Sequence, residues 1–259
     1  ERGYDIDLPK FSFPNLVGDI LTLLFRLGIE KVLSVVGHDF GSPVAAWCGL
    51  IRPDIFRSVV FMSAPFAGAP SPTANGSGRM DITAELKDLE PSRKHYGRYY
   101  STHDADREML NCEQGFRNFL RAYFHVKSGD NVENNPHPLE SYSAECLSEL
   151  PTYYVMEAGL DMAETVDPHL PTQKQIACCE WLTEQDLDVY ESEFTRTGLQ
   201  GGLNWYRCGT GEISRDILQL YRQAVLNQPT MFIGGERDWG VFQTPGAYQR
   251  MQDDVCGDF

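Results

Sequence analysis

A glycine-flanked aspartate between a strand-like and a helix-like segment constrains this chain more than any other feature. Residues 35–42 read VVGHDFGS, so Asp39 is the centre of a G-x-D-x-G pattern. A turn of this shape strains the backbone of its central residue, and its glycines leave room for neighbouring backbone. We expect side chains at Gly37 and Gly41 to collide with that backbone. The pattern predicts that Asp39 is presented at the end of a strand as a nucleophile.

The hydrophobic pattern around this turn predicts a parallel sheet with helices between its strands. Residues 32–36 form a short run that is apolar on both faces, and Pro43 can open a helix directly after the turn. Residues 11–27 have apolar positions at helical spacing, whereas residues 56–62 and 229–233 are typical of buried strands. The alternation of helix and strand predicts an α/β fold with right-handed crossovers.

The middle of the chain has a different composition from its two ends. A linker rich in Pro, Gly, Ser and Ala covers residues 64–78, and the following stretch to about residue 228 is charged, aromatic and helical in period, without convincing strands. We therefore predict a split core with a helical cap inserted between its halves. The core takes residues 1–78 and 228–259, and the cap takes residues 79–227.

An aspartate nucleophile restricts the chemistry more than a serine would. A carboxylate attacks a saturated electrophilic carbon and becomes an alkyl ester of the enzyme. Water then attacks the carbonyl carbon of that ester, and the first amides of the following helix can stabilise the charge that develops. Epoxides and alkyl halides fit this sequence of steps. The alternative, a capping aspartate in an ordinary turn, is disfavoured by the strand and helix that flank Asp39, and His38 is expected to pack rather than act as a base.

Charge and cysteine content narrow the partners and the compartment. The formal net charge is −15, with 37 acidic and 22 basic residues, and this excess repels phosphate backbones, so nucleic acid is not an expected partner. Seven irregularly spaced cysteines indicate reduced thiols in a cytoplasmic protein. No stretch approaches the ~18 consecutive apolar residues of a membrane span.

The segment around Asp39 resembles the nucleophile segment of the epoxide hydrolase branch of the α/β-hydrolases. The similarity continues through residues 43–47, 52–54 and 62–65, and it reappears in the inserted region and near the end of the chain. The resemblance implies a mostly parallel core sheet flanked by helices, with a helical cap. It also implies an enzyme that opens a small-molecule epoxide with water to a vicinal diol, without a metal or organic cofactor. A homodimer is left open.

The same resemblance implies two cap tyrosines that hold the epoxide oxygen. Tyr99 falls where the first is expected, and Tyr206, within the distinctive LNWYR segment, matches the second. Ring opening leaves an alkoxide, which phenol donors stabilise as its charge develops. Tyr96 and Tyr100 lie close to Tyr99, so packing is the alternative role for that residue.

Three further positions complete the site that the resemblance implies. Asp238 follows the last predicted strand and is the expected charge-relay acid, with Glu236 as its rival. Phe40, beside the nucleophile, and Trp205, beside the second tyrosine, are expected to line the oxyanion and substrate pocket.

The sequence departs from the family pattern in two places. It contains no His-Gly-x-Pro type oxyanion loop before the turn, and none of its six histidines follows Asp238, where the family carries its catalytic base. Three predicted core strands would also leave apolar sheet edges open. We expect the sequence to be part of a longer chain, or else a truncated, inactive homologue.

Two other functions compete with epoxide hydrolysis. A haloalkane or haloacid dehalogenase uses the same aspartate, but it often carries a tryptophan after the nucleophile, where this chain has Phe40. An inactive binding protein that keeps only the pocket is the third interpretation, because fold alone does not determine function.

Overall fold

The computed structural model describes residues 3–70, 82–213 and 215–259, and the chain divides into two compact units. We call them the helical unit and the sheet unit, and each is described by itself. The helical unit comprises residues 1–8, 81–134 and 143–211, and the sheet unit comprises residues 9–80, 135–142 and 212–259. Within the described residues, no helix combines the length and the apolar character needed to cross a bilayer.

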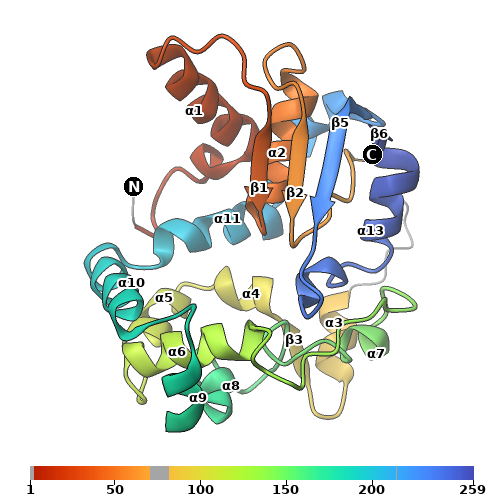
Figure 1. The fold of residues 1–259 in the computed structure, drawn as a ribbon. Coiled ribbons are helices and arrows are strands. Elements are labelled where there is room, and N and C mark those ends of the chain that lie inside the picture. Colours follow the sequence, from red (N-terminus) through yellow and green to blue (C-terminus); the bar gives the residue numbers. More distant parts are fainter. Residues whose placement is uncertain (1–2, 71–81, 214) are drawn as a thin grey trace. The chain divides into compact units, whose positions relative to one another are not determined.

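Four parallel strands form the centre of the sheet unit (Figure 1). Their spatial order is β1-β2-β5-β6, and their bounds are Val35–His38, Val59–Met62, Leu226–Ile233 and Cys256–Asp258. The predicted α/β fold class is therefore confirmed. The last strand was not predicted, because three residues that include Gly257 and Asp258 carry no strand-like pattern.

The register of these strands brings three chain segments to one edge of the sheet. His38 pairs with Met62, and Met62 pairs with Ile233, so all three strands end at the same level. Because the strands are parallel, the residues that follow them, beginning with Asp39, emerge at a common edge. Ligand sites in open α/β sheets lie at this carboxyl edge.

Helix α2 (Gly41–Ile51), which follows β1, is the most buried element of the sheet unit. Helix α2 buries seven of its residues, among them Trp47, whose ring contacts Phe13, Phe66 and Tyr221 at centroid distances of 5.7–6.3 Å. The other helical segments of this unit are η1 (Leu8–Phe11), α1 (Phe13–Arg26), α12 (Arg215–Leu218), η4 (Gln219–Tyr221), η5 (Trp239–Val241), α13 (Ala247–Arg250) and the π-helix Met251–Val255.

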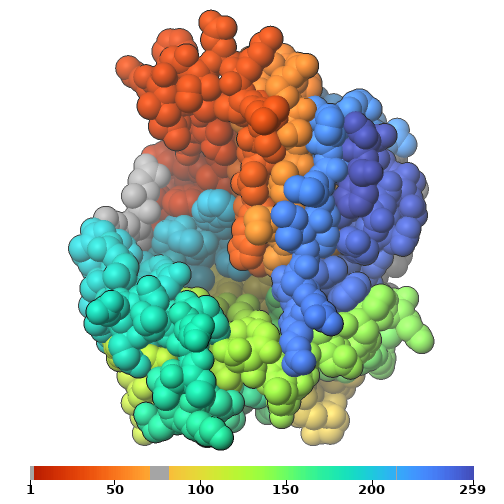
Figure 2. Space-filling model, in the orientation of Figure 1, coloured from red at the N-terminus to blue at the C-terminus, as the bar shows by residue number. Residues whose placement is uncertain are grey.

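Part of the sheet unit presents apolar side chains at its surface. Val36 on β1 is 59% exposed, and Met231 and Ile233 on β5 are 52% and 45% exposed. Figure 2 shows the side chains of β1 and β5 at the surface. Because β5 lies between β2 and β6, its exposed side chains mark an uncovered face of the sheet and not an open edge.

Nine short helices and one small sheet make up the described part of the helical unit, apart from the 3-10 turn Asp167–His169. The antiparallel pair β3 (Arg93–His95) and β4 (Val155–Glu157) corrects the expectation of an insertion without strands. Both strands are three residues long and partly charged, so they show no apolar alternation. The helices are α3 (Ile82–Asp88), α4 (Tyr96–Tyr100), α5 (Ala105–Leu110), α6 (Phe116–Lys127), α7 (Ala144–Leu147), α8 (Met162–Val166), α9 (Gln173–Cys178), α10 (Glu184–Thr197) and α11 (Gln200–Thr210).

The boundaries of the two compact units differ from those of the predicted domains. Residues 1–8 group with the helical unit, and residues 135–142 and 212–227 group with the sheet unit. The predicted functional domains, 1–78 with 228–259 and 79–227, stay a prediction.

Candidate active site

The turn after β1 holds Asp39 in a left-handed backbone conformation, with φ of 51°. Non-glycine residues rarely adopt this region, so the surrounding hydrogen bonds must maintain it. The Asp39 amide donates to the Met62 carbonyl at 3.0 Å, and the Ser42 amide donates to the Asp39 carbonyl at 3.0 Å. The Phe40 amide donates to Oδ2 of Asp39 at 2.6 Å, so the carboxylate receives a backbone donor at the start of α2.

The two glycines of the turn have different roles. A Cβ on Gly37 would lie 2.0 Å from the Gly41 carbonyl oxygen, which no side chain could occupy. A Cβ on Gly41 would meet no heavy atom within 4 Å, so the expected collision there is wrong. Steric crowding therefore requires glycine only at position 37, because the backbone of Gly41 occupies the space where a Gly37 side chain would lie.

A buried serine after the turn was missed in the sequence. Ser42 is fully buried, and its hydroxyl Oγ donates to the carbonyls of Gly37 and Met62 at 3.0 Å each as alternative acceptors. This hydroxyl therefore joins the strand before the turn to the neighbouring strand β2. Nothing in the G-x-D-x-G pattern itself identifies it.

The residues on either side of Asp39 point to different surroundings. The Phe40 ring stacks on Phe13 with a centroid distance of 5.9 Å and an interplanar angle of 19°. His38 is exposed, which corrects the expectation that it packs in the turn. Side chains along β1 alternate between the two faces of the sheet, and His38 lies on the exposed face, as Val36 does.

The predicted acid lies in a turn that follows β5. Oδ1 of Asp238 accepts a hydrogen bond of 2.7 Å from the Gly240 amide, which caps the short helix η5. A Cβ on Gly240 would lie 2.4 Å from Oγ of Ser63, so this turn presses closely against the residue after β2. Asp238 and Asp39 therefore both adjoin the end of β2. Glu236 is exposed.

One histidine of the sheet unit lies beside this turn. The His137 ring contacts Trp239 at a centroid distance of 5.0 Å, and both residues belong to the sheet unit. Its sequence position, inside the predicted cap, gave no sign of this neighbourhood. In the described part of the chain, no three His, Cys, Asp or Glu side chains gather as metal ligands would.

In the helical unit, Tyr206 on α11 lies against two tyrosines of α4. Its ring contacts Tyr96 at 5.6 Å and Tyr100 at 5.0 Å between centroids. Tyr99 faces elsewhere: it packs on Tyr100, and Nζ of Lys94 lies 5.2 Å from its ring centroid. Its hydroxyl is buried, and this burial raises the pKa of Tyr99. The structure thus groups Tyr206 with Tyr96 and Tyr100, neither of which was predicted to belong to the site.

A neutral histidine determines where α4 begins. Nδ1 of His95 accepts a 3.1 Å hydrogen bond from the Gly97 amide, and the ring packs on Tyr96 at 4.7 Å between centroids. Burial, assisted by the nearby Arg98, lowers the pKa of His95 to about 4. The unprotonated ring is therefore available as an acceptor, and it orients the first residue of the helix.

The opposite face of α11 is fixed by a buried polar cluster. Asn204 is fully buried, and its Oδ1 accepts hydrogen bonds from Gln200 at 2.9 Å and Arg207 at 3.0 Å. Its Nδ2 donates to the Gly3 carbonyl at 3.2 Å, and the Arg207 guanidinium lies 3.5 Å from the centroid of the Tyr4 ring. These contacts set the rotation of the helix that carries Tyr206.

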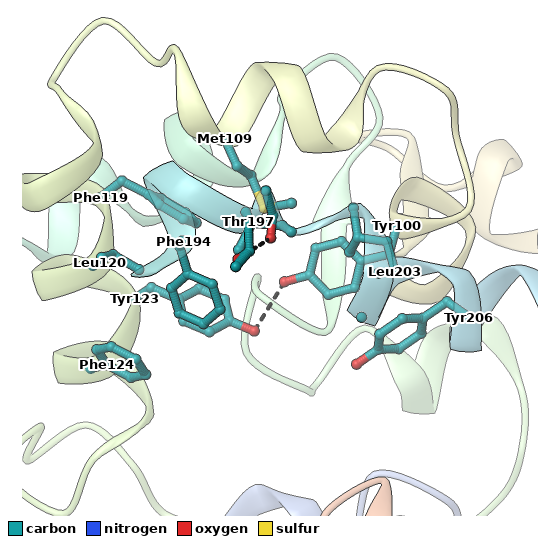
Figure 3. Close-up of a pocket in the computed structure, with 14 residues that line it drawn as sticks. Tyr100, Met109, Phe119, Leu120, Tyr123, Phe124, Phe194, Thr197, Leu203 and Tyr206 are labelled. Carbon is teal, nitrogen blue, oxygen red and sulfur yellow. Dashed lines mark hydrogen bonds between the residues drawn. The ribbon is translucent and has the colours of Figure 1, made fainter. Parts of the chain in front are cut away.

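A cavity of about 460 Å³ lies within the helical unit, next to this tyrosine group (Figure 3). Trp205, which was expected to line a pocket, is not among the residues around it. The lining residues are Tyr100, Met109, Phe119, Leu120, Tyr123, Phe124, Phe194, Thr197, Gly198, Leu199, Gly201, Gly202, Leu203 and Tyr206.

The chain matches a known fold family over most of its length. The model of the α/β-hydrolase fold family matches residues 3–251. Epoxide hydrolase B of Mycobacterium tuberculosis (strain ATCC 25618 / H37Rv) is 30% identical over 251 residues, which are 94% of this chain and 68% of that protein. Epoxide hydrolase 3 of Siraitia grosvenorii is 26% identical over 258 residues, with 95% and 66% covered.

Among solved structures, an epoxide hydrolase from an endophytic Streptomyces superposes with a TM-score of 0.67 at 26% identity. The match covers 97% of this chain and 66% of that one. The chain thus spans about two thirds of the length of the relatives it matches.

Proposed function

Because this chain belongs to the epoxide hydrolase branch of the α/β-hydrolase family, we propose that it opens an epoxide through a covalent ester on Asp39. The observation that carries the proposal is the left-handed φ of 51° at Asp39, directly after β1. A strained acidic residue at the carboxyl edge of a parallel sheet is the arrangement that nucleophilic attack needs. The family predicted from the sequence is confirmed, whereas the roles of individual residues are proposals.

The reaction proceeds in two steps. An Asp39 oxygen attacks one ring carbon, the bond between that carbon and the ring oxygen breaks, and the oxygen takes a proton from a tyrosine phenol. Water then adds to the carbonyl carbon of the ester, and the collapse of that intermediate releases a vicinal diol and restores the carboxylate. The phenolate recovers its proton over the cycle.

Tyr206 and Tyr96 are the proposed proton donors. Their rings are in contact, 5.6 Å apart between centroids, and in this proposal both hydroxyls donate to the one oxygen atom of the epoxide. Tyr99, which the resemblance favours, stays a prediction that competes with Tyr96. Its burial and raised pKa make it the less suitable donor.

Asp238 is the proposed acid that orients the water-activating base. It is half-buried and has one oxygen occupied by the Gly240 amide, whereas the rival Glu236 is exposed. We assign the base itself to no residue of this chain. The competing dehalogenase and inactive-homologue interpretations gain nothing from the comparisons, whose relatives carry the name epoxide hydrolase.

Intact mass spectrometry tests the proposal directly. The protein is incubated with styrene oxide, and Asp39→Asn serves as the matched variant. We expect either an adduct of one epoxide per chain or release of the diol, and neither in the variant. A folded parent protein that yields neither product, or a variant that is labelled equally, would refute the proposal.

Compartment and oligomeric state belong to the same proposal. None of the seven cysteines, all of which lie in the described part of the chain, is in a disulfide, which supports the proposed cytoplasmic location because reduced thiols persist there. The small-molecule substrate and water are the only partners that the mechanism uses. The homodimer stays a prediction, which light scattering of the purified chain tests.

A further inference from the structure

We propose that Lys127 is a positioning residue for the proton-donating tyrosines, because its ammonium group stabilises the phenolate that each donor becomes when the epoxide ring opens. The inference deepens the proposed function and rests on it, since a phenolate forms only if a tyrosine protonates the ring oxygen. Lys127 is the last residue of α6, and every residue of the argument belongs to the helical unit.

Three tyrosine rings surround the ammonium group of Lys127, and we call them the aromatic cage. The Nζ atom lies 4.6 Å from the ring centroid of Tyr123, 4.7 Å from that of Tyr153 and 5.1 Å from that of Tyr154. Tyr153 and Tyr154 are buried, and Lys127 itself is half-buried. A cation within about 6 Å of a ring centroid is attracted by the ring face, so three such contacts hold the ammonium in one place.

One wall of the aromatic cage touches a proposed proton donor. The Tyr154 ring meets the Tyr96 ring edge-on, with a centroid distance of 5.3 Å and an interplanar angle of 75°. The Tyr96 amide also donates a 2.8 Å hydrogen bond to the Tyr154 carbonyl. The ammonium of Lys127 is thus separated from Tyr96 by a single ring, across which its field is screened less than in water.

Another wall of the aromatic cage leads to the second donor. Figure 3 shows the hydroxyls of Tyr100 and Tyr123 pointing toward each other, and Tyr100 donates to Tyr123 at 2.9 Å. The Tyr100 ring in turn contacts the Tyr206 ring at 5.0 Å between centroids. Burial raises the pKa of Tyr100, so this residue remains a neutral phenol and does not compete with Tyr206 as the donor.

The charge of Lys127 acts on the reaction because proton donation changes the charge of the tyrosine. The donor goes from a neutral phenol to an anion, while the epoxide oxygen becomes a neutral hydroxyl. A nearby positive charge lowers the free energy of the phenolate and has little effect on the phenol. The stabilisation therefore grows toward the transition state, which is the condition for faster ring opening.

A second lysine of the helical unit provides an internal control. Nζ of Lys94 lies 5.2 Å from the ring centroid of Tyr99, which is not a proposed donor. Loss of this charge removes a similar cation–ring contact without affecting Tyr96 or Tyr206. The two lysines therefore distinguish the general effect of losing such a contact from the specific effect on the donors.

Charge variants of Lys127 test the assignment through the rate at which styrene oxide labels Asp39, measured by intact mass. Lys127→Met keeps an unbranched side chain without its charge, and we expect labelling about tenfold slower than in the parent. Lys127→Arg keeps the charge and should recover most of that factor. Lys94→Met should react at the parent rate. Circular dichroism verifies folding, and Lys127→Gln replaces Lys127→Met if that variant does not fold.

Chemical rescue separates the effect of the charge from the effect of packing. Lys127→Ala empties the aromatic cage, and tetramethylammonium, a cation that does not react with epoxides, should accelerate its labelling. The uncharged tert-butanol, of similar size, should not, and sodium chloride controls for ionic strength.

A folded Lys127→Met labelled at the parent rate, a Lys127→Arg as slow as Lys127→Met, or equal rescue by both additives would overturn the inference while the proposed function stands. A parent protein that yields neither adduct nor diol would refute the proposed function and this inference with it.

Discussion

The amide of Asp39 donates a 3.0 Å hydrogen bond to the carbonyl of Met62, which joins the nucleophile turn to the adjacent strand. The hydroxyl of Ser42 also reaches that carbonyl. Backbone strain at the nucleophile is thus maintained from β2 as well as from the turn itself.

Replacing Ser42 should weaken the turn. Ser42→Ala removes a fully buried hydroxyl and leaves carbonyl groups short of a donor, so we expect a loss of about 1–3 kcal/mol in unfolding free energy. Ser58→Ala, which removes a comparable bond to the Leu33 carbonyl at a more exposed position, should cost less. Urea denaturation measures both. Equal losses would show that the Ser42 hydroxyl has no special role.

The two glycines of the turn should respond in opposite ways. Gly37→Ala puts a Cβ 2.0 Å from the Gly41 carbonyl oxygen, so the turn must distort, and we expect failure to fold or loss of labelling at Asp39. Gly41→Ala enters open space at the first position of α2 and should preserve folding and labelling. Circular dichroism and intact mass distinguish these results. A disruptive Gly41→Ala would contradict the steric argument.

Single tyrosine-to-phenylalanine variants should separate the proton donors from the packing residues. We expect Tyr206→Phe and Tyr96→Phe to slow alkylation of Asp39 by about 100-fold, the lower end of the effect of a positioned acid. Tyr99 packs on Tyr100, so Tyr99→Phe removes only a buried hydroxyl and should leave the rate nearly unchanged. Stopped reactions analysed by intact mass give the rates. A large loss in Tyr99→Phe with none in Tyr96→Phe would restore the original assignment.

Stability should fall below neutral pH because of His95. Its pKa is lowered from 6.5 to about 4 in the fold, so the unfolded chain binds the proton more readily. The lowered pKa adds about 3 kcal/mol at most to the free energy of unfolding by linkage. This contribution is complete above pH 6.5 and is lost as the pH falls through 4. His95→Asn keeps a capping acceptor but does not titrate. Urea denaturation at pH 7 and 4.5 should therefore show a smaller difference for this variant, and an equal difference would contradict the assignment.

Local patterns predicted much of the sheet unit. The G-x-D-x-G turn, the run before it and the segment 229–233 carry strong signals because each depends on residues adjacent in sequence. Strands β3 and β6 are three residues long and carry no such signal.

The pairing of Tyr96 with Tyr206 escaped prediction for a different reason. It joins residues 110 positions apart, and only the rotation of two helices decides that Tyr96 and Tyr100, and not Tyr99, contact the Tyr206 ring. His137 beside Trp239 is a similar case, since its segment belongs to the sheet unit although the surrounding sequence does not.

The polar face of α11 holds residues from the start of the chain, with Asn204 bonded to Gly3 and Cys208 bonded to Leu8. The helical unit is consequently built from separate stretches of the sequence, and no single stretch contains all of its contacts. A gene fragment encoding residues 82–211 alone would leave the buried amide of Asn204 without Gly3 and the guanidinium of Arg207 without Tyr4. If this unit were expressed as one contiguous piece, α11, the helix that presents Tyr206, would therefore lose the contacts that fix its rotation.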